Sequence, residues 1–247
     1  MRIMIYTLAL SALLLAPWPS QAQAPASGSV RIEEQTIHLK RESGQEAVIH
    51  APVVKGVPDE ALRSRIQDSA GLKAGTDKTL EEWKQDFEDS WWLNEIEYKV
   101  GYNRNRILNL IYTVSGAGAY PDSTTTSVVV DLRTGKLLAA RDLFKSSSLK
   151  ALAAKLNRDL KTDIAATRRK WGADWKDTEE EMKDARFDIG HLNDFTIGAR
   201  GITFHYDFGF PHVIKAMEPR GTYFLSWKQL APYIDRQGPL GVFLDPR

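Results

Sequence analysis

The chain has 247 residues, in which 33 lysines and arginines are balanced by 32 aspartates and glutamates, and it contains no cysteine. The near-zero net charge excludes the basic surface typical of proteins that bind nucleic acid or anionic membranes. The lack of cysteine excludes disulfides, thiolate metal sites, cysteine nucleophiles and a lipid-modified cysteine anchor.

The N-terminus has the pattern of a secretory signal peptide. A positively charged start precedes an apolar run over residues 3–15, which is shorter than the ~20 apolar residues of a membrane span. We predict a signal peptide over residues 1–22, and an uncleaved anchor is the alternative. Cleavage after Ala22 is favoured over cleavage after Ala24, because Pro25 would directly follow the second cut. The mature protein is expected in the periplasm or outside the cell, with no transmembrane segment.

The mature chain begins with the pattern of a hairpin. Residues 23–29 are small and polar and are expected to form a linker. Alternating apolar and polar residues then predict strands over 30–40 and 47–54. Pro58-Asp59 predicts the start of a helix, which glycines interrupt further along the chain.

Two main helices are predicted. The first begins at Thr79, which has the capping-box spacing with Glu82. The second covers residues 149–164 and follows serines 146–148, which are suitable N-caps. A second capping-box pattern at Thr178 predicts a short further helix. Each main helix has one apolar stripe, formed by Leu80, Trp83, Phe87 and Trp91 in the first and by Leu149, Leu152, Leu156, Leu160 and Ile164 in the second.

The remaining strands favour antiparallel pairing. Strands over 95–102, 107–115 and 124–132 are joined by short turns, a pattern that predicts a meander. A second hairpin is expected over residues 195–204. The last strand, 223–225, is followed by Ser226 as the cap of a short helix.

These elements predict one α+β domain over residues 30–235. Its sheet is expected to be mainly antiparallel, with the two main helices packed on it. Residues 236–247 are rich in proline and glycine and are expected to form a loose C-terminal tail.

One cluster of residues has the composition of a metal site. On a strand, His205 and Asp207 point to the same face, and His212 returns after a loop. A hydrolytic zinc site needs three such ligands and an open position. A hydrolase that uses these three residues is therefore one hypothesis. The alternative is that they satisfy the backbone of turns, with no metal and no cofactor.

Aromatic residues are concentrated in the segment from Tyr206 to His212, which also contains Phe208 and Phe210. Exposed aromatic rings bind sugar rings or protein partners. This segment therefore predicts a binding surface, and the alternative is that its rings belong to the edge of the core.

Residues Tyr112 to Gly135 read YTVSGAGAYPDSTTTSVVVDLRTG, and Leu138 to Phe144 read LAARDLF. This resembles the extracellular domain of RsiV-type, lysozyme-sensing anti-sigma factors, a domain of unknown function that also stands beside peptidoglycan deacetylase domains. The family pattern has a tyrosine strand, a Gly-Gly-Ala-His turn, a strand ending in Asn/Asp-Leu-x-Thr-Gly-Lys and a Leu-x-Asp-Leu-Phe segment. The resemblance covers roughly residues 30–235.

The resemblance implies an α+β fold and a cell-envelope setting. The family histidine falls at Tyr120, and neither a deacetylase domain nor an anti-sigma segment with its membrane helix is recognisable. It points to residues 116–122 and 206–212 as binding loops. We therefore expect a non-catalytic envelope module that binds a lysozyme-like protein or a peptidoglycan glycan, and the alternatives are the hydrolase above and an accessory subunit of an envelope complex. The expected contacts are Tyr120, Tyr206, Phe208, Phe210 and His212.

Overall fold

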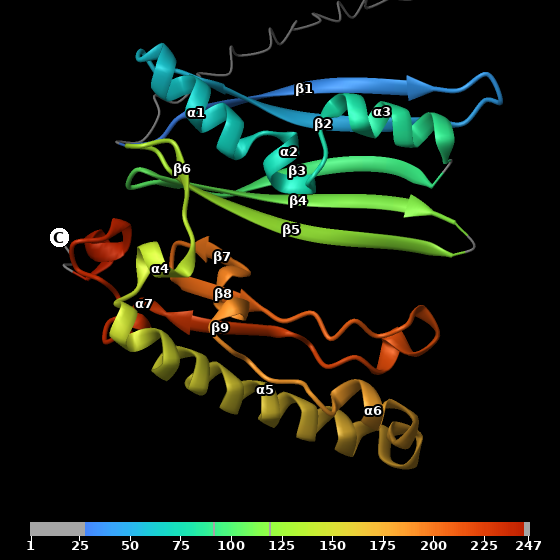
Figure 1. The fold of residues 1–247 in the computed structure, drawn as a ribbon, viewed down its shortest axis with the longest axis vertical. Helices are drawn as coiled ribbons and strands as arrows, with labels where there is room; N and C mark the ends of the chain where they lie inside the picture. The colour runs from blue at the N-terminus through green and yellow to red at the C-terminus, as the bar shows by residue number, and fades with distance from the viewer. Residues whose placement is uncertain (1–27, 91, 119, 245–247) are drawn as a thin grey trace, which may run out of the picture.

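The computed structural model describes residues 28–90, 92–118 and 120–244 (Figure 1). The predicted signal peptide and most of the predicted linker lie outside the described residues, as does Trp91. Within the described part of the chain, no helix combines the length and the apolar character that crossing a membrane requires.

The larger of two sheets has six strands in sequence order (Figure 1). Neighbouring strands are antiparallel, except that β2 and β3 are parallel. The first hairpin and the meander are thus confirmed, each strand within a few residues of its expected bounds. The strands are β1 (Arg31–Lys40), β2 (Glu46–Lys55), β3 (Leu93–Arg104), β4 (Ile107–Ala117), β5 (Pro121–Asp131) and β6 (Lys136–Leu137).

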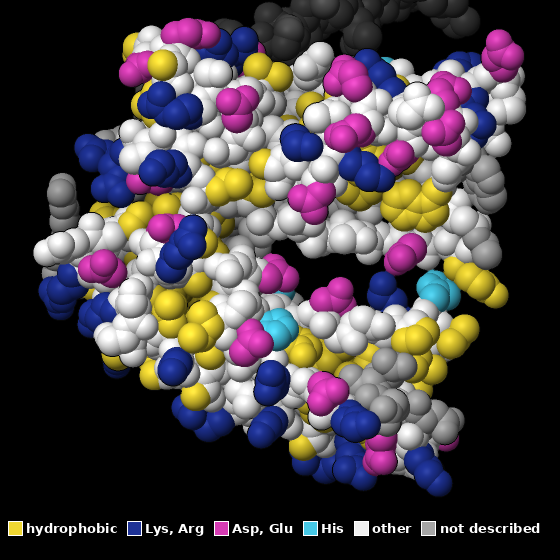
Figure 2. Space-filling model, viewed as in Figure 1, with side chains coloured by type: hydrophobic (Ala, Val, Ile, Leu, Met, Phe, Trp, Pro, Cys, Tyr) yellow, Lys and Arg dark blue, Asp and Glu magenta, His cyan; other side chains and the backbone are white. Residues whose placement is uncertain are grey.

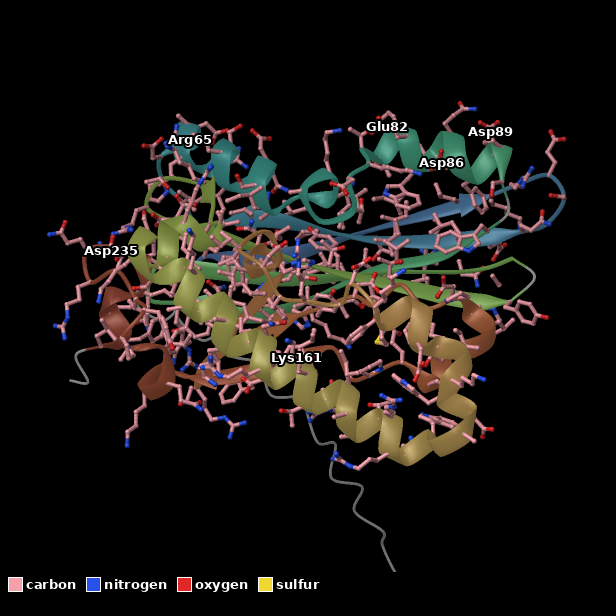
Figure 3. All side chains as sticks on the ribbon, turned by 60° about the horizontal axis from the view of Figure 1, so that its bottom comes forward. Arg65, Glu82, Asp86, Asp89, Lys161 and Asp235 are labelled. Atoms are coloured by element: carbon pink, nitrogen blue, oxygen red, sulfur yellow. The ribbon has the colours of Figure 1, made fainter. Side chains whose placement is uncertain are left out.

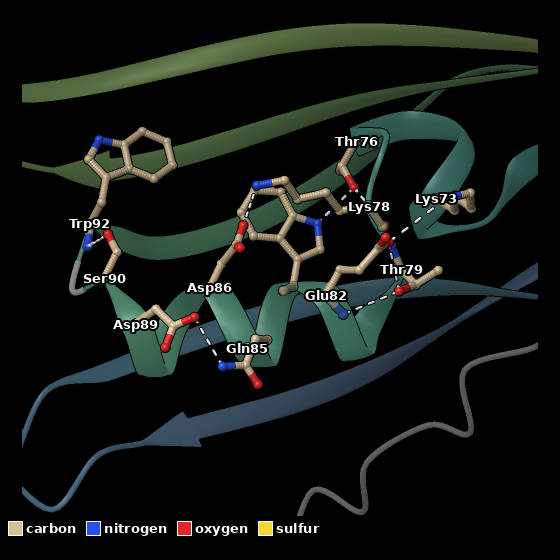
Figure 4. A network of polar contacts seen from close by, with 11 residues as sticks. Lys73, Thr76, Lys78, Thr79, Glu82, Gln85, Asp86, Asp89, Ser90 and Trp92 are labelled. Carbon is tan, nitrogen blue, oxygen red and sulfur yellow. Dashed lines mark hydrogen bonds and ion pairs between the residues drawn. The ribbon is translucent and has the colours of Figure 1, made fainter.

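Three helices connect the parallel strands β2 and β3 and cover one face of this sheet: α1 (Glu60–Ala70), α2 (Leu72–Thr76) and α3 (Leu80–Asp89). Asp59 caps α1, and Thr79 and Glu82 form the predicted capping box of α3 (Figure 4). The indole N–H of Trp83 donates to Thr76 Oγ1 over 2.8 Å. These bonds fix the helices above a core that includes Phe87, Ile49 and Tyr112.

The second half of the chain forms a three-stranded antiparallel sheet that packs on a long helix (Figure 1). In Figure 3, Lys161 lies on the outer side of this helix, α5. The elements are α4 (Ala140–Leu143), α5 (Leu149–Trp171), α6 (Glu179–Met182), β7 (Phe195–Gly198), β8 (Gly201–His205), β9 (Thr222–Ser226) and α7 (Trp227–Leu230). Short 3-10 turns cover 146–148, 172–178, 190–193, 212–217 and 239–243.

Together the two halves confirm the α+β class, the mainly antiparallel sheet and the two main helices, now α3 and α5. Several details differ from expectation. The second main helix continues to Trp171, and Ser148 makes no side-chain cap bond. The Thr178 hydroxyl donates to the carbonyl of Trp175, 2.8 Å away, and so closes the turn before α6.

The C-terminal tail is packed up to Leu244, so the expectation of a loose tail is wrong for residues 236–244. Leu240 is fully buried, and the Phe243 ring stacks on Trp227 with centroids 3.8 Å apart. Gly and Pro here shape a 3-10 turn, and apolar side chains hold that turn against the core.

The two sheets meet at one end only, on the face of the large sheet that the helices leave open. There, Tyr102, Ile107 and Val129 belong to the core of the second half. The buried Asn109 side chain on β4 joins both sheets. Its Oδ1 accepts from the Ile197 N–H of β7 over 2.8 Å, and its Nδ2 donates to Val128 O and Ser127 Oγ of β5.

Candidate functional site

Beyond this junction the two sheets separate and leave a cleft of ≈ 430 Å³. Figure 2 shows the hollow between the two halves of the molecule. One wall comes from β4 and β5, and the other comes from β7, β8 and the segment that leads into β9. The cleft lies between regions far apart in the sequence, as ligand sites commonly do.

The first wall is rich in hydroxyl groups. Ser123, Thr124, Thr125 and Ser127 of β5 line it, together with Ile111 of β4. Residues 121–126 are exposed, whereas residues 128–131 of the same strand are buried. β-Branched threonines favour the extended backbone, and their hydroxyls leave this part of the strand polar. The wall can therefore donate and accept hydrogen bonds.

The opposite wall carries titratable groups. Thr196 Oγ1 and His205 Nε2 lie 3.2 Å apart in a hydrogen bond between β7 and β8. Burial lowers the pKa of the His205 imidazole, and the nearby Asp194 carboxylate opposes that shift. His205 therefore favours its neutral form in the folded protein.

Asp194 behaves in the opposite direction. Although its side chain is exposed at the cleft wall, the surrounding protein raises the pKa of its carboxyl by desolvation. His205 lowers the pKa of Asp194 in turn, and the negative charge of Asp207 raises it. Asp207 accepts a hydrogen bond from the Gly209 N–H over 2.8 Å. The cleft thus holds two carboxyl groups, and the charge of Asp207 acts on the pKa of Asp194.

Contacts between two loops close the outer end of the cleft. The exposed rings of Tyr120 and His212 are stacked, with centroids 4.8 Å apart and planes inclined by 20°. Lys215 Nζ lies 3.2 Å from Asp122 Oδ1. The Ser123 N–H and, after it, Lys215 hold the pKa of the Asp122 carboxyl below its ordinary value. We call these four residues, Tyr120, Asp122, His212 and Lys215, the clasp.

The structure brings together some of the expected contact residues. Tyr120 and His212, 92 positions apart in the chain, meet in the clasp, and Tyr206 lines the cleft. The Tyr206 ring stacks on His191, and its hydroxyl accepts from the Arg186 N–H over 3.1 Å. Of the five expected residues, these three lie where a ligand can reach them.

Phe208 and Phe210 are placed differently. Both are buried in the core of the second half, where Phe210 packs near Trp175 and Phe208 near Tyr206. This packing matches the interpretation that the two rings belong to the core. Gly209 lies between them with a positive φ, and the turn that it forms lets both flanking side chains face inward.

The metal hypothesis finds no ligand set. Among the described residues, no three histidine, aspartate or glutamate side chains are grouped closely enough to hold an ion. His205 bonds with Thr196, and His212 stacks on Tyr120 at the rim. The hypothesis needed His205, Asp207 and His212 to converge, and they do not.

Sequence reasoning missed Asp194, Asn109 and the hydroxyl row of β5. The five hydroxyl residues from Ser123 to Ser127 were the available signal, because a strand with one buried face normally alternates apolar and polar residues. Asn109, an amide within an apolar strand, was a second signal.

No family model and no curated protein sequence matches the chain. Its fold is nevertheless similar to solved structures. A DUF3298 family protein from Pseudomonas aeruginosa has a TM-score of 0.59 at 16% identity, with 88% of this chain and 98% of that chain covered. A member of the same family from Bacteroides fragilis has a TM-score of 0.52 at 15% identity, covering 90% and 99%.

The chain has the fold of these DUF3298 proteins. At such low identity the likeness concerns the fold alone, and the name denotes a domain of unknown function. The finer resemblance to the RsiV-type domain stays a prediction.

Proposed function

We propose that this protein is an exported binding module of the bacterial cell envelope, and that it holds its ligand in the cleft between the two sheets. The observation that carries the proposal is the cleft itself, which is lined by hydroxyls and carboxylates and closed at one end by the clasp. From the resemblance, the expected ligand is a lysozyme-like protein or a peptidoglycan glycan.

The chemistry of the walls supports binding. Ligand sites place a few polar groups to orient the ligand, and here Thr125, Thr196 and Thr222 supply hydroxyls from both walls. Tyr206 adds a ring whose outer part is accessible. A ring of this kind contributes contact area at a small cost in conformational entropy.

The test uses the absence of native cysteine. In the mature chain, residues 23–247, a Thr125→Cys variant carries a single thiol within the cleft, and a Ser43→Cys variant carries one in the exposed β1–β2 turn. Each is labelled with an environment-sensitive fluorophore and titrated with lysozyme or with soluble peptidoglycan fragments.

A saturable change at position 125 without a change at position 43 supports the proposal. Equal responses, or none from either label while the unlabelled protein still sediments with peptidoglycan, would place binding outside the cleft and overturn it. Sedimentation of the unlabelled chain therefore accompanies the titration.

Hydrolysis of a glycan in the same cleft is a second candidate, and Asp194 is the observation that favours it. A carboxyl with a raised pKa beside a second carboxylate is the arrangement of a general acid and its partner. Release of reducing ends from peptidoglycan by the wild type, lost in Asp194→Asn, would support this function. Release of reducing ends at the same rate by Asp194→Asn and by the wild type would rule out this function.

A further inference from the structure

The cleft contains an unpaired strand edge. β5 pairs with β4 along its whole length, from Pro121 to Asp131. On its other side it pairs with β6 only at Val130 and Asp131. From residue 123 to residue 127 no described strand lies beside that second edge.

Alternation along the strand identifies the groups on this edge. In an antiparallel ladder, successive residues direct their N–H and C=O groups to opposite sides. The Val129 carbonyl accepts from the Leu138 N–H over 2.8 Å, away from β4. Thr125 and Ser127 therefore also direct their backbone groups outward. Within the described chain, neither has a backbone hydrogen-bond partner there, whereas the Ser123 N–H is bound by Asp122 Oδ1.

This edge faces the cleft. Ser123, Thr124 and Thr125 are consecutive, so their side chains point alternately to the two faces of the sheet, yet all three line the cleft. The feature that consecutive residues share is the backbone edge. At about 3.3 Å per residue, the free stretch has room for a partner strand of roughly five residues.

The edge lacks the usual protection against pairing. Exposed edges are commonly guarded by charged residues, and β1, the opposite edge strand, carries Arg31, Glu33, Glu34 and Lys40. Residues 123–127 carry no charge. Their position within the cleft shields them from pairing with another sheet but leaves them open to a single chain.

The charges in the cleft favour a basic ligand. Its two cations are paired with acids, Lys215 with Asp122 and Arg220 with Asp163. Its three acids, Asp194, Asp207 and Glu218, have no ion-pair partner within the described residues. A lysine or arginine side chain entering the cleft would meet uncompensated carboxylates.

We propose that the free edge of β5 receives an extended peptide segment as an additional strand, with a basic side chain directed at Asp194 and Asp207. This inference rests on the proposed function, because it names the ligand class of the same cleft. Main-chain hydrogen bonds to Thr125 and Ser127 supply affinity, and the acids select the side chain.

The test distinguishes the contribution of the backbone N–H from that of the side-chain hydroxyl at one position. Thr125→Pro removes the outward N–H, which the ladder to β4 does not use, so the substitution is tolerable in an edge strand. Thr125→Ala removes the hydroxyl and keeps the N–H. The probe is a library of random twelve-residue peptides displayed on phage, selected on the wild-type mature chain, and enriched peptides are then measured by fluorescence anisotropy.

We expect enriched peptides to share basic residues at alternate positions. Their affinity should fall at least about tenfold in Thr125→Pro and by less than about threefold in Thr125→Ala, in line with the loss of one backbone hydrogen bond that is well desolvated. N-methylation of single peptide residues should reduce binding to the wild type at alternate positions, which tests the edge without any change in the protein.

Three results would overturn the inference: no enriched peptide, equal binding to Thr125→Pro, or N-methylation without effect. Peptidoglycan fragments that shift the label at position 125 and lose affinity in Thr125→Ala would assign the cleft to a glycan, and the proposed function would survive while the peptide inference fails. Failure of the proposed function is distinct, since it requires that no ligand changes the label at position 125 more than the label at position 43.

Discussion

The two ends of β5 differ in composition and in what they contact. Residues 123–127 are all serine or threonine, and all of them except Thr126 line the cleft, whereas Val128, Val129 and Val130 are buried. At the valine end the two sheets of the molecule pack together, and at the hydroxyl end they separate (Figures 1 and 2). The composition of one strand thus sets how far two layers close on each other.

The physical reason is the cost of burying hydroxyls. A hydroxyl taken from water without a partner costs about 1–3 kcal/mol in proteins, whereas burial of a valine side chain is favourable by about 1.5 kcal/mol or more. Closing the sheets over this stretch would need a partner for each hydroxyl on the face of β5 that is turned toward the second half. The sheets close only where Val129 and Asn109 make closure favourable.

The largest predicted effect concerns Asn109, which joins the sheets at the closed end. Asn109→Ala leaves the buried Ile197 N–H without an acceptor and opens a small cavity, so the free energy of unfolding should fall by about 3 kcal/mol. Urea denaturation of the mature chain measures this. Ser127→Ala removes a single bond of the same amide and should cost about 1 kcal/mol.

A loss below about 1 kcal/mol in Asn109→Ala would contradict the role of this residue as the junction. An unfolding transition that splits into two steps would strengthen this role, because the two halves would then unfold separately.

The second prediction exchanges the character of the two ends of β5. Val129→Thr places an unpartnered hydroxyl in the core and should reduce the free energy of unfolding by about 1–2 kcal/mol. Thr125→Val, at the hydroxyl end of β5, should change the free energy of unfolding by less than about 0.5 kcal/mol. Similar costs at both positions would contradict the difference between the ends.

Much of the fold could be predicted from the sequence because its signals are local. The capping boxes at Thr79 and Ser226 and the leucine stripe of α5 each depend on residues within a few positions. The parallel pairing of β2 with β3, and the extension of α5 to Trp171, depend on distant contacts that no local pattern encodes.

The candidate site could be predicted only in part, for the same reason. Aromatic composition indicated the segment from Tyr206 to His212, and the resemblance indicated Tyr120. Composition cannot distinguish a ring that faces solvent from one that faces the core, so Phe208 was grouped with Tyr206. Asp194 gains its raised pKa only from the tertiary fold.

The third prediction concerns the outer end of the cleft, where the clasp replaces a packed core. Tyr120→Ala removes the stack on His212 and should cost less than about 1 kcal/mol of stability, since both rings are exposed. Amide hydrogen exchange in residues 206–221 should nevertheless become faster. Val213→Ala, an exposed change in the same turn, is the control and should leave exchange unchanged. Unaltered exchange in Tyr120→Ala would mean that the clasp does not restrain this loop.

The smallest effects on stability are expected from the titratable groups in the wall of the cleft. Because burial lowers the pKa of His205, the unfolded chain binds a proton at this residue more readily than the folded protein does. The stability from this group is present above the ordinary histidine pKa of about 6.5, and it is lost as the pH falls through the folded value. His205→Asn should therefore make stability decline less on acidification below pH 6.5.

Asp194 changes stability with pH in the opposite direction, because desolvation by the surrounding protein and the charge of Asp207 raise the pKa of its carboxyl. The stability that this carboxyl contributes is fully present below its unfolded pKa and is lost as the pH rises through the folded value. Asp194→Asn should remove that loss and raise stability at neutral pH relative to the wild type. Unfolding measured between pH 4 and pH 7 for both variants checks the two signs together. A desolvated site favours a neutral imidazole and a neutral carboxyl alike, so the two variants should change the slope of the free energy of unfolding against pH in opposite directions. A change in the same direction in both variants would contradict the environments described for His205 and Asp194.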